Sequence, residues 1–80
     1  MSTTTFDQIS ESLREACSFS APAARGTVRL ALMQSGHRPQ TVTPTQMEQV
    51  LKSIMPEMLY ERGVRHPANI CQGLLRELQA

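Results

Sequence analysis

The sequence has few of the residues that usually carry chemistry or anchor a large core. It contains no tryptophan, three other aromatic residues, two cysteines and two histidines. Its eight basic and seven acidic residues leave a formal net charge of +1, which is too small to draw nucleic acid or an anionic membrane to the molecule as a whole. No apolar run approaches the length of a membrane span, and the start lacks the basic and apolar regions of a secretory signal. We therefore expect a cytoplasmic protein with an aliphatic core and no membrane contact.

The pattern that is present is helical throughout. Apolar residues recur with a period near 3.6 in every segment that shows a pattern, and no strand signal, internal repeat or low-complexity tract appears. A chain of 80 residues buries only roughly 60% of its unfolded surface, so one small domain is expected. The sequence predicts an all-α fold, a small orthogonal bundle of four to five short helices, in a single domain over residues 1–80 with a disordered tail at 1–5. The predicted helices cover residues 6–17, 21–35, 44–55, 56–62 and 67–79.

The clearest helix start lies at residues 42–47. Thr43 can cap the first turn, Pro44 stands where a missing N–H costs nothing, and Gln46 can complete a capping box. Val42 and Met47 have the spacing of a hydrophobic staple. A helix beginning at Pro44 is therefore expected.

The apolar faces of these helices predict the core. Gly73 inside the last helix costs about 1 kcal/mol relative to alanine, which is tolerable if another helix packs closely there. The helix at 21–35 has apolar residues spread so widely that we expect it to be buried on more than one side. The predicted core consists of Phe6, Ile9, Leu13, Val28, Leu32, Val50, Leu51, Ile54, Ile70, Leu74 and Leu78.

Charges on the first two helices suggest how they pair. The short connection between them predicts an antiparallel pair, in which Arg25 and Arg29 would face the acidic stripe of Asp7, Glu11 and Glu15. Arg25 and Arg29 could instead face phosphate or an acidic partner, but the ion pairs within the chain explain them without a partner.

Neither a metal site nor a catalytic site is expected. Cys17, His37, His66 and Cys71 have the composition of a zinc site, but only His66 and Cys71 are close in sequence, whereas structural zinc ligands come in closely spaced pairs. The sequence has no phosphate-binding glycine loop, no nucleophile elbow and no paired carboxylates in an apolar stretch. We expect no enzyme activity, no catalytic residues and no cofactor, and both cysteines should be free thiols.

Pro56 makes the segment after residue 54 the candidate partner site. A proline inside a helix removes a hydrogen bond and forces a kink. Two outcomes are open: apolar residues beyond the kink point outward and form a partner or dimer contact, or the kink wraps them around the core. The partner-binding residues predicted by the first outcome are Met55, Met58, Leu59 and Tyr60.

Nucleic-acid binding is the alternative. Residues 56–62, the connection 63–66 and the last helix have the lengths of a helix-turn-helix unit. Asn69, Gln72 and Arg76 on the exposed face of that helix could read base edges. Three arginines balanced by three glutamates over residues 53–80 disfavour this interpretation. The expected function is thus a small helical protein-interaction or regulatory module, with an unidentified protein partner or a second copy of the chain, and with DNA as the less favoured ligand.

Overall fold

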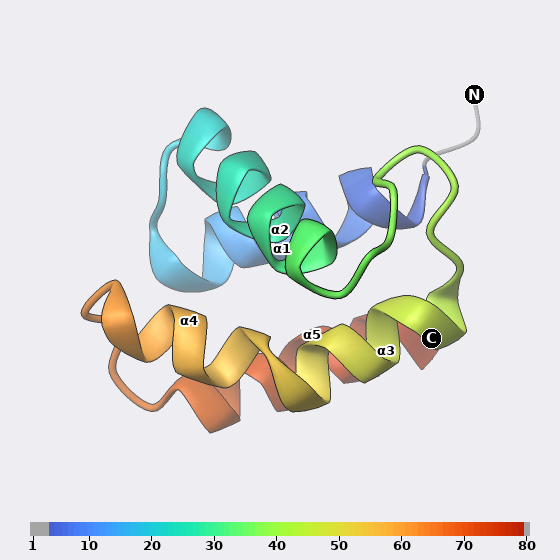
Figure 1. The fold of residues 1–80 in the computed structure, drawn as a ribbon. Helices are drawn as coiled ribbons and strands as arrows, with labels where there is room; N and C mark the ends of the chain where they lie inside the picture. The colour runs from blue at the N-terminus through green and yellow to red at the C-terminus, as the bar shows by residue number, and fades with distance from the viewer. Residues whose placement is uncertain (1–3, 80) are drawn as a thin grey trace.

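The computed structural model describes residues 4–79, and this part of the chain folds into five α-helices with no strand (Figure 1). Each predicted helix is present, with bounds that coincide with the prediction or differ by one or two residues. The all-α bundle predicted from the sequence is confirmed. The helices are α1 Thr5–Cys17, α2 Ala21–Gln34, α3 Pro44–Ser53, α4 Met55–Glu61 and α5 Pro67–Gln79.

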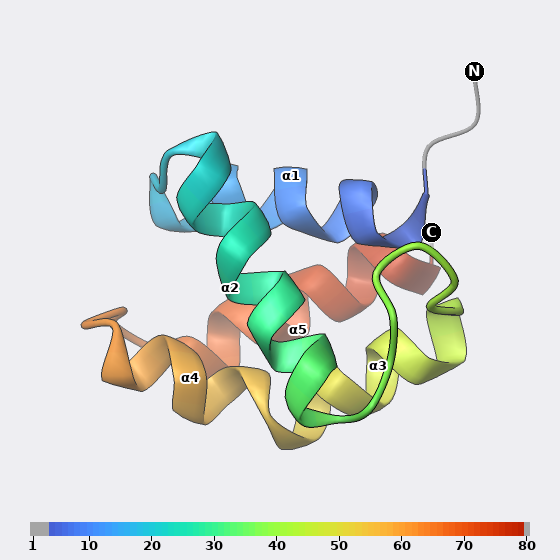
Figure 2. The same ribbon diagram turned by 45° about the horizontal axis from the view of Figure 1, so that its top comes forward.

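The helices are arranged in two layers that enclose one core. α1 and α2 form one layer, and α3, α4 and α5 form the other (Figure 1). α3 and α4 follow one another in a bent rod, because Pro56 has no N–H to continue the hydrogen-bond ladder through Ile54. α5 runs back beside this rod, and α2 crosses it steeply, as in an orthogonal bundle (Figure 2). The whole measures 31 × 25 × 23 Å.

Side-chain caps fix where three of the helices begin. The hydroxyl of Thr4 accepts a hydrogen bond from the Asp7 amide at 3.1 Å, and that of Ser20 accepts one from the Ala23 amide at 3.2 Å. The predicted capping box is present: Thr43 Oγ1 accepts from the Gln46 amide at 3.2 Å. In return, Gln46 Oε1 accepts from the Thr43 amide at 3.1 Å.

The prediction of a disordered tail over residues 1–5 is wrong for Thr4 and Thr5. Thr4 caps α1 and Thr5 is its first residue, because the Thr4 hydroxyl satisfies an amide that would otherwise have no partner. Residues 1–3 of that predicted tail lie outside the described residues.

Replacing Thr43 by alanine should lower the free energy of unfolding by roughly 0.5–2 kcal/mol, because the Gln46 amide loses its acceptor. Thermal and urea denaturation of the Thr43→Ala variant measure the loss. Thr45→Ala, which alters an exposed threonine of the same turn without touching the cap, is the control. Equal stability of the two variants would mean that the cap contributes nothing.

The core is aliphatic and rich in methionine. Eight of the eleven predicted core residues are buried. Ile54, Ile70 and Leu78 are only half-buried and pack against the edge of the core. The sequence-based core missed several residues that are fully or almost fully buried. They are Ala24, Ala31, Val42, Met47, Met55, Met58, Leu59 and Cys71.

The predicted partner patch around Pro56 does not exist as an exposed surface. Met55 and Leu59 are 0% exposed and Met58 is 5% exposed, so only Tyr60, at 74%, points into solvent. The bend before Pro56 rotates α4 so that positions 55, 58 and 59, which share one helical face, continue the buried face of α3. The kink therefore wraps these side chains around the core.

α2 is buried on one side only, which contradicts the expectation from its composition. Its inner face carries Ala24, Val28 and Leu32, each 0% exposed. On the outer face Leu30 and Met33 are 41% and 62% exposed. No other helix of the described chain covers that side, so its apolar residues meet solvent.

The predicted charge pairing between α1 and α2 is half correct. Arg25 Nη1 lies 2.8 Å from Asp7 Oδ1, and the hydrogen bond from Arg25 lowers the pKa of that carboxyl group. Glu11, however, pairs with Arg14 on its own helix. The guanidinium groups of Arg25 and Arg29 both lie over the Phe6 ring, at 4.9 and 5.9 Å from its centroid. An aromatic face thus holds these two arginines where the sequence suggested a row of carboxylates.

Candidate functional site

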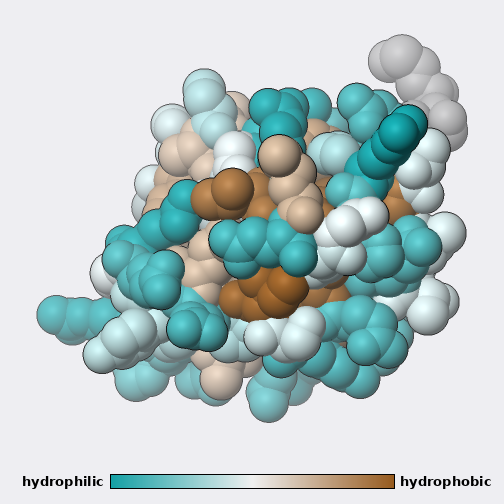
Figure 3. All heavy atoms as spheres, viewed as in Figure 1, coloured by the Kyte–Doolittle hydropathy of each residue, from teal (hydrophilic) through white to brown (hydrophobic). Residues whose placement is uncertain are grey.

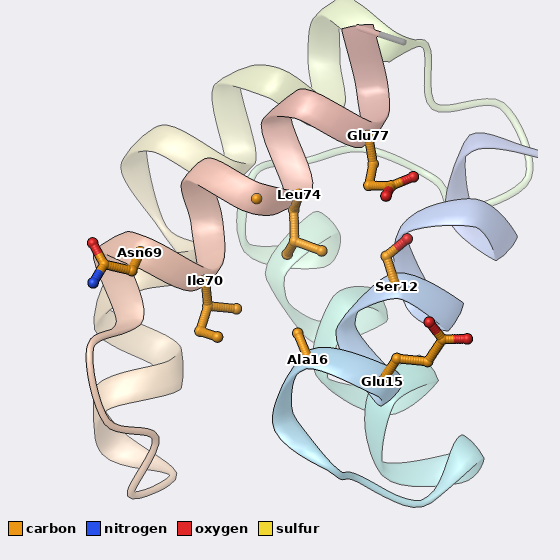
Figure 4. A pocket seen from close by; sticks show the side chains of 8 residues that line it. Ser12, Glu15, Ala16, Asn69, Ile70, Leu74 and Glu77 are labelled. Atoms are coloured by element: carbon orange, nitrogen blue, oxygen red, sulfur yellow. The ribbon is translucent and has the colours of Figure 1, made fainter.

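A shallow groove lies between α1 and α5. Its volume is about 360 Å³, at the low end of the range for ligand pockets, and it is open to solvent along one side. Figure 4 shows the side chains that line it on the two helices. The groove is lined by Ser12, Glu15, Ala16, Asn69, Ile70, Gly73, Leu74 and Glu77.

The floor of the groove is apolar, and its width depends on small residues. Ile70 and Leu74 project from α5 toward Ala16 on α1 (Figure 4). No neighbouring helix packs closely against Gly73, because a Cβ placed there meets no atom within 4 Å. Glycine in a helix costs about 1 kcal/mol relative to alanine, and no packing contact of this fold requires it here. Its effect is to leave the groove open above the floor.

The rim of the groove is acidic. Glu77 projects from α5 and Glu15 from α1, the two walls of the groove, and the Ser12 hydroxyl lies between them in the view of Figure 4. Arg14 Nη2 lies 3.9 Å from Glu15 Oε1, and Glu77 forms no ion pair with any described residue. The backbone carbonyl of Glu77 accepts a hydrogen bond from Gln8 Nε2 at 3.0 Å, which ties the end of α5 to α1. Two carboxylates on a fixed frame thus flank an apolar slot.

The residues predicted to read DNA lie on one exposed face of α5. Asn69, Gln72 and Arg76 are all exposed, and their spacing places them on the same side of the helix. Only Asn69 also borders the groove. The structure brings these three together but leaves them without any neighbouring basic helix.

The connection between α4 and α5 is a short turn. Residues 62–66 join the two helices, and Gly63, at φ +79°, makes the turn that glycine favours. Arg62 at the start of this turn donates a hydrogen bond from Nε to Thr27 Oγ1 at 3.1 Å. That contact holds the connection against α2.

The thiols are positioned as core side chains. Cys71 is buried, and burial, with a smaller contribution from nearby Cys17, raises the pKa of its thiol to about 11. Burial also raises the pKa of the Cys17 thiol. A raised pKa keeps a thiol protonated and unreactive at neutral pH. Within residues 4–79, no three side chains of His, Cys, Asp or Glu come together as metal ligands would.

The groove residues were not singled out from the sequence, and one signal could have found them. A glycine in the middle of an amphipathic helix signals either close packing or an open space, and Gly73 marks an open space. The partner across the groove, Ala16 on α1, is identified only by the way that α1 and α5 pack.

None of the helices in the described range is long and apolar enough to cross a membrane. Comparison of the chain with protein-family models, with curated proteins and with solved structures finds no match.

Proposed function

We propose that the chain is a small helical protein-interaction module, without catalytic activity of its own, whose α1–α5 groove receives a basic, partly apolar segment of another protein. The observation that carries the proposal is the combination of an apolar floor, an open glycine position and two carboxylates, one on each wall of the groove. We also propose that it acts in the cytosol, a setting in which its two free cysteines would stay reduced.

The chemistry of the groove specifies the segment that would fit. Apolar side chains of a partner would lie on Ile70 and Ala16, which keep exposed surface in the groove, and burial of that surface supplies the affinity. A lysine or arginine next to them would reach Glu15 and Glu77. Such exposed charges contribute more to specificity and association rate than to affinity. Gly73 and Ala16 allow the partner backbone to approach closely.

A pair of neighbouring substitutions on α5 tests this site. Gly73→Leu should fill the groove without disturbing the fold, because nothing lies within 4 Å of the position. Gln72→Leu introduces the same side chain one residue earlier, at an exposed position that does not line the groove. Random linear peptides displayed on phage would be selected on the wild-type protein and then measured against both variants.

We expect the selected peptides to share a consensus in which Lys or Arg stands beside apolar residues. Gly73→Leu should weaken binding by at least about tenfold, and Gln72→Leu should leave it unchanged. Glu77→Gln should weaken binding by roughly two- to fivefold and reduce its dependence on salt. No selected peptide, or equal binding by the two leucine variants, would refute the groove as the site.

Nucleic-acid binding is a second candidate, supported by one observation. Residues 62–76 contain three arginines and no carboxylate, so the exposed face of α5 and the turn before it are locally basic. Phosphate contacts from so few arginines would be weak and strongly dependent on salt.

The same two leucine variants distinguish the two candidates. Fluorescence anisotropy with a random DNA duplex at low and moderate salt measures binding through α5. If DNA is the ligand, Gln72→Leu and Arg76→Ala should reduce the anisotropy change and Gly73→Leu should not. Absence of binding at low salt eliminates this candidate.

A further inference from the structure

The outer face of α2 carries an apolar strip with the spacing of a helix–helix contact. Ala23, Gly26, Leu30 and Met33, which we call the outer strip, follow one another at intervals of three, four and three residues. This is the spacing at which one helix packs along another. All four are exposed, and Leu30 and Met33 are two of the three large hydrophobic side chains exposed in the described chain. In Figure 3, hydrophobic atoms lie over this front face among hydrophilic ones (Figure 3).

The outer strip is divided into a small half and a large half. Ala23 and Gly26 occupy the N-terminal half, and a Cβ at Gly26 would meet nothing within 4 Å. Leu30 and Met33 occupy the C-terminal half and project into solvent. A strip of this kind has a gap at one end and protruding side chains at the other.

We propose that the outer strip binds the outer strip of a second copy of this chain, with the two α2 helices antiparallel about a two-fold axis near Val28. In that arrangement position 30 of one copy faces position 26 of the other, and position 33 faces position 23. Leu30 enters the space left by Gly26, and Met33 packs on Ala23. Because a two-fold interface repeats each contact, both copies fill both gaps. The small half of one strip matches the large half of an antiparallel copy. A second copy of this chain therefore fits the strip better than an unrelated helix would.

The charges of α2 do not oppose this contact. No charged residue belongs to the outer strip, and the two arginines of α2 are directed toward α1. Arg25 binds Asp7, and both Arg25 and Arg29 have their guanidinium groups over Phe6. The two copies can therefore approach without bringing these guanidinium groups into the interface. Arg62, which borders the hollow beside Ala23 and Gly26, donates from Nε to Thr27 Oγ1 at 3.1 Å, so Leu30 of the second copy would pack beside a guanidinium group that already has a partner.

Self-association of this kind would leave the α1–α5 groove free, since no residue of α2 lines it. Each dimer would present two grooves, so a partner with two binding segments would be held with higher avidity than a single groove provides. An interface built on one 14-residue helix is small, so the dimer should be weak and dependent on protein concentration.

Sedimentation equilibrium over micromolar to millimolar concentrations of the full chain tests the proposal. The apparent mass should rise from 8.9 kDa toward twice that value. Leu30→Glu should raise the dissociation constant by more than about tenfold, because it would place a carboxylate in an apolar contact. Gln72→Glu makes the same charge change on exposed α5 and should leave the association unchanged. A wild-type chain that stays monomeric at every concentration overturns the proposal.

A compensating pair tests the antiparallel register. Gly26→Leu fills the gap and should abolish dimerisation, and Leu30→Ala should weaken it. The double variant places the large side chain at position 26 opposite the small one at position 30, and should restore the dissociation constant to within about threefold of the wild type. Circular dichroism of each variant checks that the monomer fold is retained. A double variant no tighter than Gly26→Leu alone would show that the helices do not meet in this register.

Discussion

Replacing Leu59 by alanine should lower the free energy of unfolding by about 2–5 kcal/mol. The side chain is 0% exposed in α4 and belongs to the core cluster with Met55 and Met58. Its removal loses apolar burial and leaves a cavity that a closely packed interior cannot fully fill. In a domain of this size such a loss is a large fraction of the total stability. Urea denaturation followed by circular dichroism measures it.

The neighbouring residue provides the control for this prediction. Tyr60 is 74% exposed, so Tyr60→Ala should change stability by no more than about 0.5 kcal/mol. Similar small effects at both positions would mean that α4 does not turn its 55–58–59 face into the core. That result would restore the patch around Pro56 as a candidate partner surface.

Replacing Leu74 by alanine should have a comparable effect, about 2–5 kcal/mol, for a different reason. α5 has only two buried side chains, Cys71 and Leu74, and the second is the larger. Much of the attachment of α5 to the rest of the bundle therefore depends on one leucine. Chemical denaturation should show the loss, and amide hydrogen exchange should show it concentrated in α5.

Leu78→Ala is the comparison for Leu74→Ala. Leu78 is half-buried at the far end of the same helix, so its truncation should cost clearly less. A loss below about 1 kcal/mol for Leu74→Ala would place that side chain outside the core. The orientation of α5, and with it the α1–α5 groove, would then be wrong.

The helices could be predicted because their signals are local. The capping box of Thr43 and Gln46 involves residues three apart, and Gly36 and Gly63 end helices through their own backbone conformations, at φ +78° and +79°. These features depend on steric contacts and hydrogen bonds between residues that are close in sequence, so they can be predicted from the sequence alone.

Which side of each helix packs into the core could not be predicted in the same way. Pro56 signals a kink, but the direction in which the next helix turns depends on what α3 and α5 offer to Met55 and Leu59 for packing. The α1–α5 groove requires Ala16 and Gly73, which lie far apart in the chain, to come near one another. Tertiary packing decides both, so the sequence predicted the core helices well and the candidate sites poorly.

The α1–α5 groove as a docking site is tested most directly by amide chemical shifts. The ¹H–¹⁵N spectrum of the wild-type chain would be recorded at fixed protein concentration while a selected basic peptide is added. The account predicts the largest shifts at groove residues, with Ala16 on α1 and Gly73 on α5 foremost, and none of this size in the Gly73→Leu variant. Largest shifts at Tyr60 or along α2, or an unchanged spectrum, would contradict it.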